Sequence, residues 1–361
     1  MGQKVFLCAL GFATLAVACS SQSAGDSNEP QTEGAALNSS AATDGTNVVD
    51  ISSVTDLSEY MLPPGAGYLM HKSCVHEVPN HAHVRHHRDT GVVEALAADG
   101  TSVSYQPCTK PMIRKPLSAS DSRTSLQAPF TNGWVAWSSA AAPYNSGYEW
   151  FKEVNGTWYV PANPSHNGGL LYFFNSLEPS DGSEIIQPVL QWGSNGSFGG
   201  NYWSYASWHV YTDDGGGAYY SPPQSGAVTG DYMNGDTWAT SCESAGYCNW
   251  EIRTYWQHGD EAHSYETDMF LDAFAYPNGI DAVFNTAQQG VLENYNLTSC
   301  NQYPSDGSIE FFDTYVYEPK PTNINDFKEV WSSASWSGSN ASGVTCGQDA
   351  VVFNRAVFID Y

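Results

Sequence analysis

The sequence predicts an all-β protein built on a two-sheet antiparallel β-sandwich with a small N-terminal subdomain. Aromatic residues make up 14% of the chain, with 12 Trp and 22 Tyr, and 33 Gly and 19 Pro interrupt short apolar segments throughout. After the N-terminal apolar run, no segment has a sustained apolar stripe at helical spacing. Short aromatic and β-branched runs separated by turn residues are typical of an antiparallel sandwich.

The expected strands lie in the sandwich domain, which we place at residues 126–361, and turn residues such as those at 213–217 and 234–236 separate them. They cover Trp134–Ser138, Thr157–Val160, Gly169–Asn175, Ile185–Trp192, Tyr202–Tyr211, Trp250–Trp256, Met269–Tyr276, Val291–Leu297, Ile309–Tyr317 and Val351–Phe358. Because side chains alternate along a strand, Gln187 and Gln191 should share one face. Pro188 cannot donate a ladder hydrogen bond, which indicates an edge, a bulge or a bend there.

The N-terminus has the pattern of a secretory signal over residues 1–18. Lys4 precedes an uncharged apolar run, Val5 to Ala18, that is too short to span a bilayer as a permanent helix. The segment ending in Ala18-Cys19 resembles the lipobox of bacterial lipoproteins, which predicts lipid attachment at Cys19. An ordinary signal peptide cleaved after Ala18 is the alternative. Residues 19–55 hold few bulky apolar side chains, so we expect a flexible tether.

The chain carries 38 acidic residues against 13 Lys and Arg, a formal net charge of -25. This balance excludes the clustered basic residues that nucleic acids and anionic membrane surfaces require. The sequence also lacks the glycine patterns of nucleotide and dinucleotide sites and a Gly-x-Ser-x-Gly elbow. We therefore expect a monomer that uses no cofactor, binds no nucleic acid, and contacts the membrane of the bacterial cell envelope only through a lipid anchor, if it is not fully secreted.

Beyond Cys8 and Cys19, the remaining six of the 8 cysteines form an even set, which in an exported chain indicates disulfides. Many connectivities are possible for six thiols. Grouping by position suggests the pairs Cys74 with Cys108, Cys242 with Cys248, and Cys300 with Cys346.

Residues 56–125 differ from the sandwich domain because they hold most of the histidines: His71, His76, His81, His83, His86 and His87. We interpret them as a small N-terminal subdomain and linker, either a propeptide or lid, or a structural cap. The histidines have the wrong spacing for a His-Glu-x-x-His site, and Arg85 and Arg88 lie among them. A solvated surface that titrates is favoured over a metal site, and we expect no metal.

Two predicted strands combine an amide and a carboxylate with apolar neighbours: Ile185-Ile186-Gln187 and Val291-Leu292-Glu293. Such a pair suffices to activate water against a carbonyl group. Nearby, one face of the Tyr202–Tyr211 strand carries Trp203, Tyr205, Ser207 and His209. Together with Gln191 and Tyr295, these residues could line a groove for an extended polymer. The alternative is that half-buried strands are simply rich in Tyr and Trp.

These motifs resemble, in their order, those of the eqolisins, fungal glutamic peptidases with a concanavalin A-like jelly-roll sandwich and a Gln/Glu dyad. The similarity covers roughly residues 170–301 and includes Tyr205-Ala206-Ser207-Trp208 and Gly235-Asp236. It implies that Gln187 and Glu293 are catalytic. Gly290 or Gln289 stands where that family has a Trp, and Ser207 stands where it has a Glu.

The resemblance implies an exported glutamic-type endopeptidase that hydrolyses polypeptides in mild acid with an activated water. A second class is a non-catalytic concanavalin A-like module that binds carbohydrate or peptide. A glycosidase would need two carboxylates facing each other across about 5–9.5 Å. The strands show no convincing pair of this kind, so the binding module is the better form of this alternative.

Overall fold

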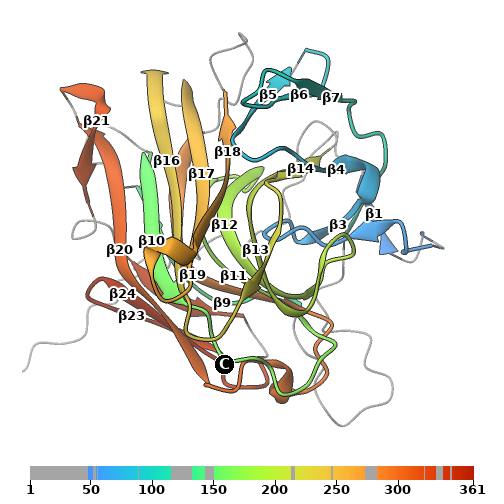
Figure 1. Ribbon diagram of the computed structural model, residues 1–361, viewed down its shortest axis with the longest axis vertical. Coiled ribbons are helices and arrows are strands. Elements are labelled where there is room, and N and C mark those ends of the chain that lie inside the picture. The colour runs from blue at the N-terminus through green and yellow to red at the C-terminus, as the bar shows by residue number, and fades with distance from the viewer. Residues whose placement is uncertain are drawn as a thin grey trace, which may run out of the picture. The chain divides into compact units, whose positions relative to one another are not determined.

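The computed structural model describes residues 48–51, 54, 56–87, 89–114, 132–142, 150–212, 216–244, 247–272, 283–320, 322–330, 336–341 and 344–361. The expected signal peptide with Cys19, most of the expected tether and the boundary near residue 125 lie outside these residues. Within the described part the protein is built from strands and a few short 3-10 helices (Figure 1), which confirms the predicted all-β sandwich.

The larger of the two main sheets has eleven strands in the described part of the chain. In spatial order these are β23 (Asp349–Phe353), β24 (Ala356–Asp360), β20 (Ser308–Lys320), β10 (Glu153–Tyr159), β16 (Tyr232–Ser244), β17 (Tyr247–Gln257), β18 (Ser264–Leu271), β5 (Ala82–His87), β6 (Val92–Leu96) and β7 (Ser102–Tyr105), with β21 (Asn323–Glu329) paired to β20.

The second main sheet has nine described strands and contains both expected catalytic strands. Its order is β22 (Ser337–Asn340), β9 (Gly133–Ala141), β19 (Phe284–Tyr295), β11 (Leu170–Pro179), β12 (Glu184–Ser194), β13 (Gly199–Tyr211), β14 (Gly217–Tyr220) and β4 (Val75–Glu77), with β15 (Gln224–Ala227) paired to β13.

The described residues of 48–114, which we call the N-terminal segment, form a small sheet of their own. Its order is β1 (Val48–Asp50), β8 (Met112–Arg114), β3 (Tyr68–His71) and β2 (Tyr60–Met61). The short helices are η2 (Lys72–Cys74), η3 (Glu261–His263) and η4 (Cys300–Gln302). Among the described residues, no helix has the length and apolar character needed to cross a membrane.

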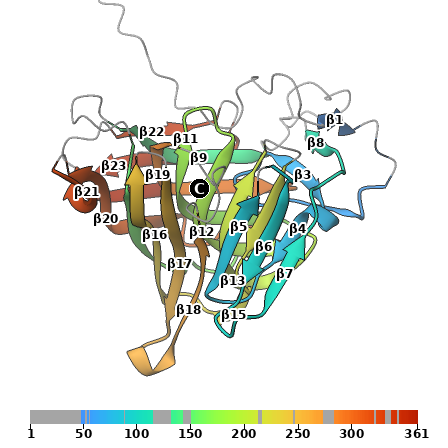
Figure 2. The same cartoon turned by 90° about the horizontal axis from the view of Figure 1, so that it is seen from above.

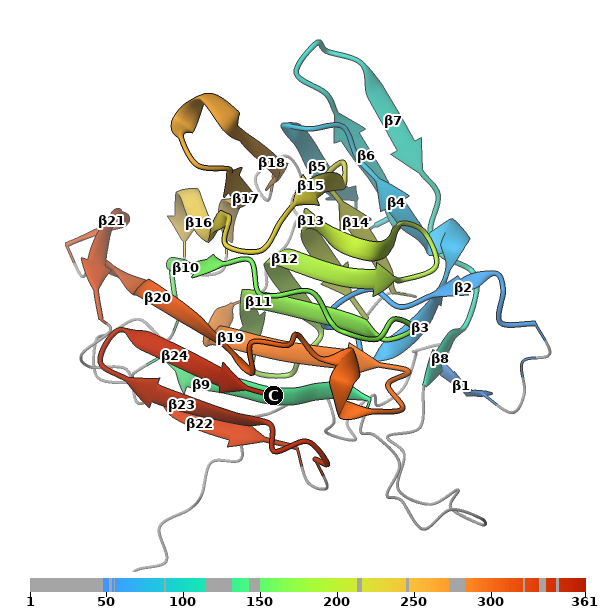
Figure 3. The same ribbon diagram turned by 60° about the horizontal axis from the view of Figure 1, so that its bottom comes forward.

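Both faces of the nine-stranded sheet are buried, and a separate apolar cluster covers each face. Toward the eleven-stranded sheet, Leu171, Phe173 and Leu190 belong to the main core. On the opposite, outer face, Tyr172 and Val189 pack with residues of the N-terminal segment. Figure 3 shows β2 and β3 beside β11 and β12. Alternation along each strand therefore sends both sets of apolar side chains into cores.

The N-terminal segment continues both main sheets instead of standing apart from them. Strand β4 pairs in parallel with β14, and β5 pairs in parallel with β18. From β5, the strands β6 and β7 extend the sheet further (Figure 2). All other described pairs in the two main sheets are antiparallel, as the sequence predicts. The segment is thus joined to the sandwich by backbone hydrogen bonds at two sheet edges.

The three disulfides suggested by position are all present: Cys74–Cys108, Cys242–Cys248 and Cys300–Cys346. The first closes the N-terminal segment on itself. The second joins facing residues of β16 and β17 near their connection. These bonds limit the freedom of the unfolded chain, and each can stabilise the fold by about 2–4 kcal/mol.

Several strand expectations need correction. The run Val351–Phe358 is a hairpin of β23 and β24, not one strand, because Asn354 adopts a φ of 53° and reverses the chain. The segment 234–236, expected as a turn, lies inside the long strand β16. Strand β18 ends at Leu271, and 273–276 of the expected Met269–Tyr276 strand lie outside the described residues.

Gly235 shows why a turn signal occurs inside a strand. A Cβ atom at this position would lie 2.6 Å from Pro188 Cγ and 2.8 Å from the Trp158 ring. Glycine here allows the two sheets to approach closely where Pro188 protrudes. Around Pro188 the β11–β12 pairing is interrupted, between the pairs Phe174–Val189 and Leu177–Ile186. This agrees with the ladder defect expected from the proline.

We expect Gly235→Ala to destabilise the protein by about 1–3 kcal/mol, because the added methyl overpacks the contact between the sheets. The control is Gly200→Ala, where the new Cβ would meet only the exposed, movable ring of Tyr202. Denaturant unfolding of both variants measures the difference. Equal stability of the two variants would contradict the close contact at Gly235.

Candidate active site

The structure places the two expected catalytic side chains on one face of the nine-stranded sheet. Strands β12 and β19 flank β11, where Tyr172 faces Glu293 on one side and Gln191 on the other. Facing residues of antiparallel strands point to the same side. Gln187 lies four residues from Gln191 in an unbroken register with β13, so it shares this face. Both Gln187 and Glu293 are 0% exposed.

Gln187 and Glu293 hold the two sides of a single peptide bond, which joins Pro64 to Gly65. The Gln187 Nε2 amide donates to the Pro64 carbonyl oxygen at 2.7 Å. The Gly65 N–H donates to Glu293 Oε2, also at 2.7 Å. The amide thus lies where a donor would stabilise a developing oxyanion, and the carboxylate lies against the nitrogen that would leave.

The Pro64–Gly65 peptide bond lies in the loop of a β-hairpin that packs on the sheet. Strands β2 and β3 pair through Tyr60 with His71 and Met61 with Met70. Between them runs the loop Leu62–Gly67, which we call the covering loop. Its residues 62–66 are buried. The Tyr172 hydroxyl donates to the Leu62 carbonyl at 2.5 Å, and the Leu62 N–H donates to the Asn195 carbonyl at 3.0 Å, which fixes the entry of the loop.

Gly65 is required at the tip of the covering loop for two reasons. Its φ is +75°, a left-handed conformation that side chains disfavour. A Cβ atom would also lie 2.8 Å from Ile185 Cδ1 and 3.0 Å from Gln187 Nε2. Gly67 in the same loop also has a positive φ, +64°, but a Cβ there would have no atom within 4 Å. The contact with the sheet is therefore specific to Gly65.

Burial dominates the electrostatics of Glu293 and raises its pKa to about 7. The hydroxyl of Tyr295, which donates to Glu293 Oε1, and the Gly65 N–H both act in the opposite direction and favour the ionised form. Gln187 Oε1 is buried and has no hydrogen-bond partner among the described residues. An unpartnered buried acceptor costs about 1–3 kcal/mol.

Two of the expected substrate-binding residues, Tyr295 and Gln191, lie on the same face as the dyad, but their side chains are hydrogen bonded within the protein. Tyr295 orients the Glu293 carboxyl through its hydroxyl, so we assign it a positioning role. Gln191 donates to the Gly193 carbonyl at 2.8 Å and accepts from Asn195 Nδ2 at 3.2 Å. It therefore fixes the turn between β12 and β13.

The other four expected substrate-binding residues face away from the dyad, which corrects their grouping with it. On β13, Trp208 faces Gln187, so its neighbours of opposite parity point to the other side of the sheet. These are Trp203, Tyr205, Ser207 and His209, all buried between the two main sheets. His209 Nε2 is hydrogen bonded to the buried Glu184 carboxyl at 2.5 Å. The sequence pattern separates the two faces of β13 but does not say which one meets the dyad.

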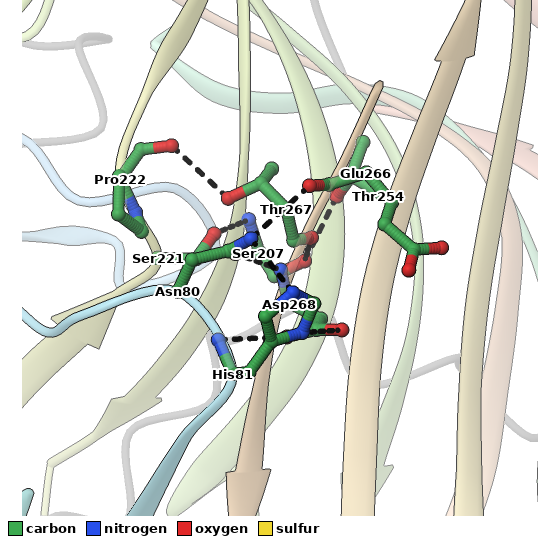
Figure 4. A network of polar contacts seen from close by, with 9 residues as sticks. All are labelled: Asn80, His81, Ser207, Ser221, Pro222, Thr254, Glu266, Thr267 and Asp268. Carbon is green, nitrogen blue, oxygen red and sulfur yellow. Dashed lines mark hydrogen bonds and ion pairs between the residues drawn. The ribbon is translucent and has the colours of Figure 1, made fainter. Parts of the chain in front are cut away.

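Ser207 has a structural role that the sequence did not reveal. Its hydroxyl lies 3.0 Å from Thr254 Oγ1 and donates to the Thr267 carbonyl at 2.9 Å, so it joins β13 to β17 and β18 across the core (Figure 4). The same network includes the N-terminal segment, where Asn80 Oδ1 accepts from the Asp268 N–H. Ser207 thus ties the two main sheets together.

One cluster in the described part of the chain has residue types that ligate metals: His81, Glu266 and Asp268, with ligand atoms within 4.8 Å of one another. His81 Nδ1 is hydrogen bonded to the Asp268 carboxylate at 2.8 Å. His83 Nδ1 likewise contacts Asp272 at 2.7 Å. These histidines attach the N-terminal segment to β18 and to the residue that follows it.

The residues that occupy the site are not among those predicted from the sequence. Pro64 and Gly65 complete it, and Tyr172 anchors the covering loop. The Pro63-Pro64-Gly65 run is a turn signal that could have marked a loop tip. Nothing in its composition indicates that this tip reaches β12 and β19, because the contact joins residues more than a hundred positions apart.

Comparison of the sequence with protein-family models and with curated proteins gives no match. Among solved structures, a crystal structure of Scytalido-glutamic peptidase with a peptide-based transition state analog is matched with a TM-score of 0.40 and 13% identity. The match covers 64% of this chain and 98% of that chain. It is a distant structural resemblance.

We expect Tyr295→Phe to raise the pKa of Glu293 above its value in the wild-type protein, because the lost hydroxyl stabilises the ionised carboxyl. Carbon-13 NMR titration of labelled glutamate carboxyls measures this, and Glu293→Gln identifies the resonance. An unchanged or lowered pKa would show that Tyr295 does not hold Glu293.

Burial raises the pKa of other carboxyls besides Glu293, namely Glu178 and Glu153 to about 8, Glu251 to about 7 and Asp236 to about 6. A carboxyl with a raised pKa binds its proton more tightly in the folded protein than in the unfolded chain. Its stabilising contribution is complete below the unfolded pKa, near 4.5 for Glu, and is lost as pH rises through the folded value.

We therefore expect the free energy of unfolding to fall between about pH 4.5 and about pH 8. Burial lowers the pKa of His76, so this one group contributes stability that increases with pH and partly offsets the effect of the carboxyls. Urea unfolding at a series of pH values measures the slope. Stability that increases over this interval would contradict the burial of these carboxyls.

Proposed function

We propose that this protein is a glutamic-type endopeptidase that uses Gln187 and Glu293 to hydrolyse peptide bonds. The observation that carries the proposal is the contact of these two side chains with opposite sides of the Pro64–Gly65 peptide bond. An amide donor on the carbonyl oxygen and a carboxyl group on the nitrogen are the two groups that peptide hydrolysis needs when no metal or nucleophilic side chain takes part.

The reaction follows from these positions. Ionised Glu293 takes a proton from a water as the water oxygen bonds to the substrate carbonyl carbon. The Gln187 amide stabilises the resulting oxyanion. The carbon–nitrogen bond then breaks, and protonated Glu293 returns the proton to the leaving amine. A carboxyl that performs both steps works near the pKa that it has in the open site.

The three disulfides support an exported protein, because such bonds persist in oxidising compartments. We propose that the chain acts on polypeptides in the bacterial cell envelope or outside the cell. Attachment through a lipid at Cys19 is part of the same proposal. Metabolic labelling with a fatty acid, compared between the wild-type protein and Cys19→Ala, tests the anchor.

The dyad is tested with Glu293→Gln, which keeps the size of the side chain, and Gln187→Ala, which removes the donor. We expect each to lower hydrolysis of an unfolded protein substrate by about 10²-fold or more. The assay spans about pH 3 to 8 and uses the full chain and the full chain with Gly65→Ala, whose added Cβ should displace the covering loop. Fragment release measured by mass spectrometry gives the rate.

Glu153→Gln is the matched control, because burial also raises the pKa of Glu153, which lies on β10 of the other main sheet. This substitution should leave the rate of hydrolysis within a few fold of that of the parent protein. Thermal unfolding of every variant checks that each one folds. Hydrolysis that survives in Glu293→Gln would reject the dyad. If no form hydrolyses substrate but the opened site retains peptide, the binding-module alternative replaces the enzyme.

A further inference from the structure

We propose that the covering loop, Leu62–Gly67, is an intramolecular inhibitor that keeps the Gln187/Glu293 site latent. This inference rests on the proposed function and names the regulation of the same site. The loop's Pro64–Gly65 bond uses the Gln187 donor and the Glu293 carboxylate at once. A substrate that needs the same two groups cannot bind while the loop is in place.

The shape of the loop favours an inhibitor over a substrate. Gly65 has a φ of +75°, and the flanking strands β2 and β3 pair with each other. The chain therefore enters and leaves the site on the same side, as a hairpin. A linear substrate would instead enter and leave at opposite ends of a groove. The loop presents one peptide bond to the dyad near the tip of this hairpin.

The flanking structure would hold the ends of this bond together even after a cut. Strand β2 is paired with β3, and Leu62 is hydrogen bonded to Tyr172 and Asn195. On the other side, β3 pairs with β8, and the Cys74–Cys108 bond closes the same segment. Two ends kept in reacting geometry rejoin readily, because their effective concentration is very high. A constrained loop of this kind resists net hydrolysis.

Apolar burial adds the affinity that an inhibitor needs. Met61, Leu62 and Ala66 are buried in the same cluster as Tyr172, Ile185 and Val189 of the outer face. This cluster extends through Leu69, Met70, Met112 and Ile113 of the N-terminal segment. The loop and its supporting strands therefore seal the dyad from solvent. Because the loop is part of the same chain, its local concentration exceeds that of a free peptide.

The two glycines of the loop provide a matched pair of variants. Gly65→Ala places a Cβ against Ile185 Cδ1 and Gln187 Nε2, so it should displace the loop from the dyad. Gly67→Ala imposes the same left-handed strain but adds no contact with the sheet. Ile185→Val removes the Cδ1 atom at the closest contact and should partly restore inhibition in the Gly65→Ala background.

The experiment measures hydrolysis of an unfolded protein substrate and binding of a fluorescent peptide with the sequence of residues 60–68. We expect Gly65→Ala to hydrolyse substrate about tenfold faster than the wild-type protein, or more, since overpacked contacts shift an equilibrium by that order. It should also bind the peptide, whereas the wild-type protein and Gly67→Ala should not. In the wild-type protein the Gly65 amide hydrogen should exchange slowly, which tests the proposal even if Gly65→Ala does not fold.

The proposal is overturned if the wild-type protein, Gly67→Ala and Gly65→Ala hydrolyse substrate equally, or if the Gly65 amide exchanges as fast as an unprotected one. Intact mass spectrometry after incubation at mildly acid pH gives a further test. A stable cut between Pro64 and Gly65 would make the loop a substrate. If no variant hydrolyses substrate but only Gly65→Ala binds the peptide, the loop does close the site while the proposed enzyme activity fails.

Discussion

The outer face of the nine-stranded sheet depends on satisfying two polar side chains inside an apolar layer. Gln187 and Glu293 are fully buried there, between side chains such as Tyr172 and Val189. A buried carboxylate is tolerated only with hydrogen bonds, and a buried amide also needs partners. The Pro64–Gly65 bond supplies an acceptor for Gln187 Nε2 and a donor for Glu293 Oε2, while Gln187 Oε1 has no partner among the described residues. A single peptide group therefore makes the covered arrangement possible.

The N-terminal segment is closely built into the rest of the fold. Its strands extend both main sheets, and its carboxylate-paired histidines, His81 and His83, attach it to β18 and the residue after it. These contacts involve strands other than β12 and β19, which carry the dyad. The segment's affinity for the sandwich is thus spread over sheet edges and an apolar layer. The dyad itself contributes two hydrogen bonds at the tip.

Local sequence patterns predicted the features that depend on residues close together in the chain. Alternation placed Gln187 and Gln191 on one face, the proline marked the ladder defect at Pro188, and spacing along the chain suggested the disulfides. What could not be predicted depends on distant packing. The sequence shows that Ser207 and Trp208 point to opposite sides, but only the second sheet decides that Ser207 is the inner one. The run Asn234-Gly235-Asp236 has the composition of a turn. Only the close contact of Gly235 with Pro188 of the other sheet explains why this glycine lies within a strand.

Titration of the dyad alone would not open the site in acid. While covered, Glu293 has a raised pKa, so the covered form binds the proton more tightly than an opened, hydrated site would. By linkage, acidification through this group favours the covered form. Release of the covering loop therefore needs a change other than protonation of Glu293. Once hydrated, Glu293 would return toward its ordinary pKa and act as a base in mild acid.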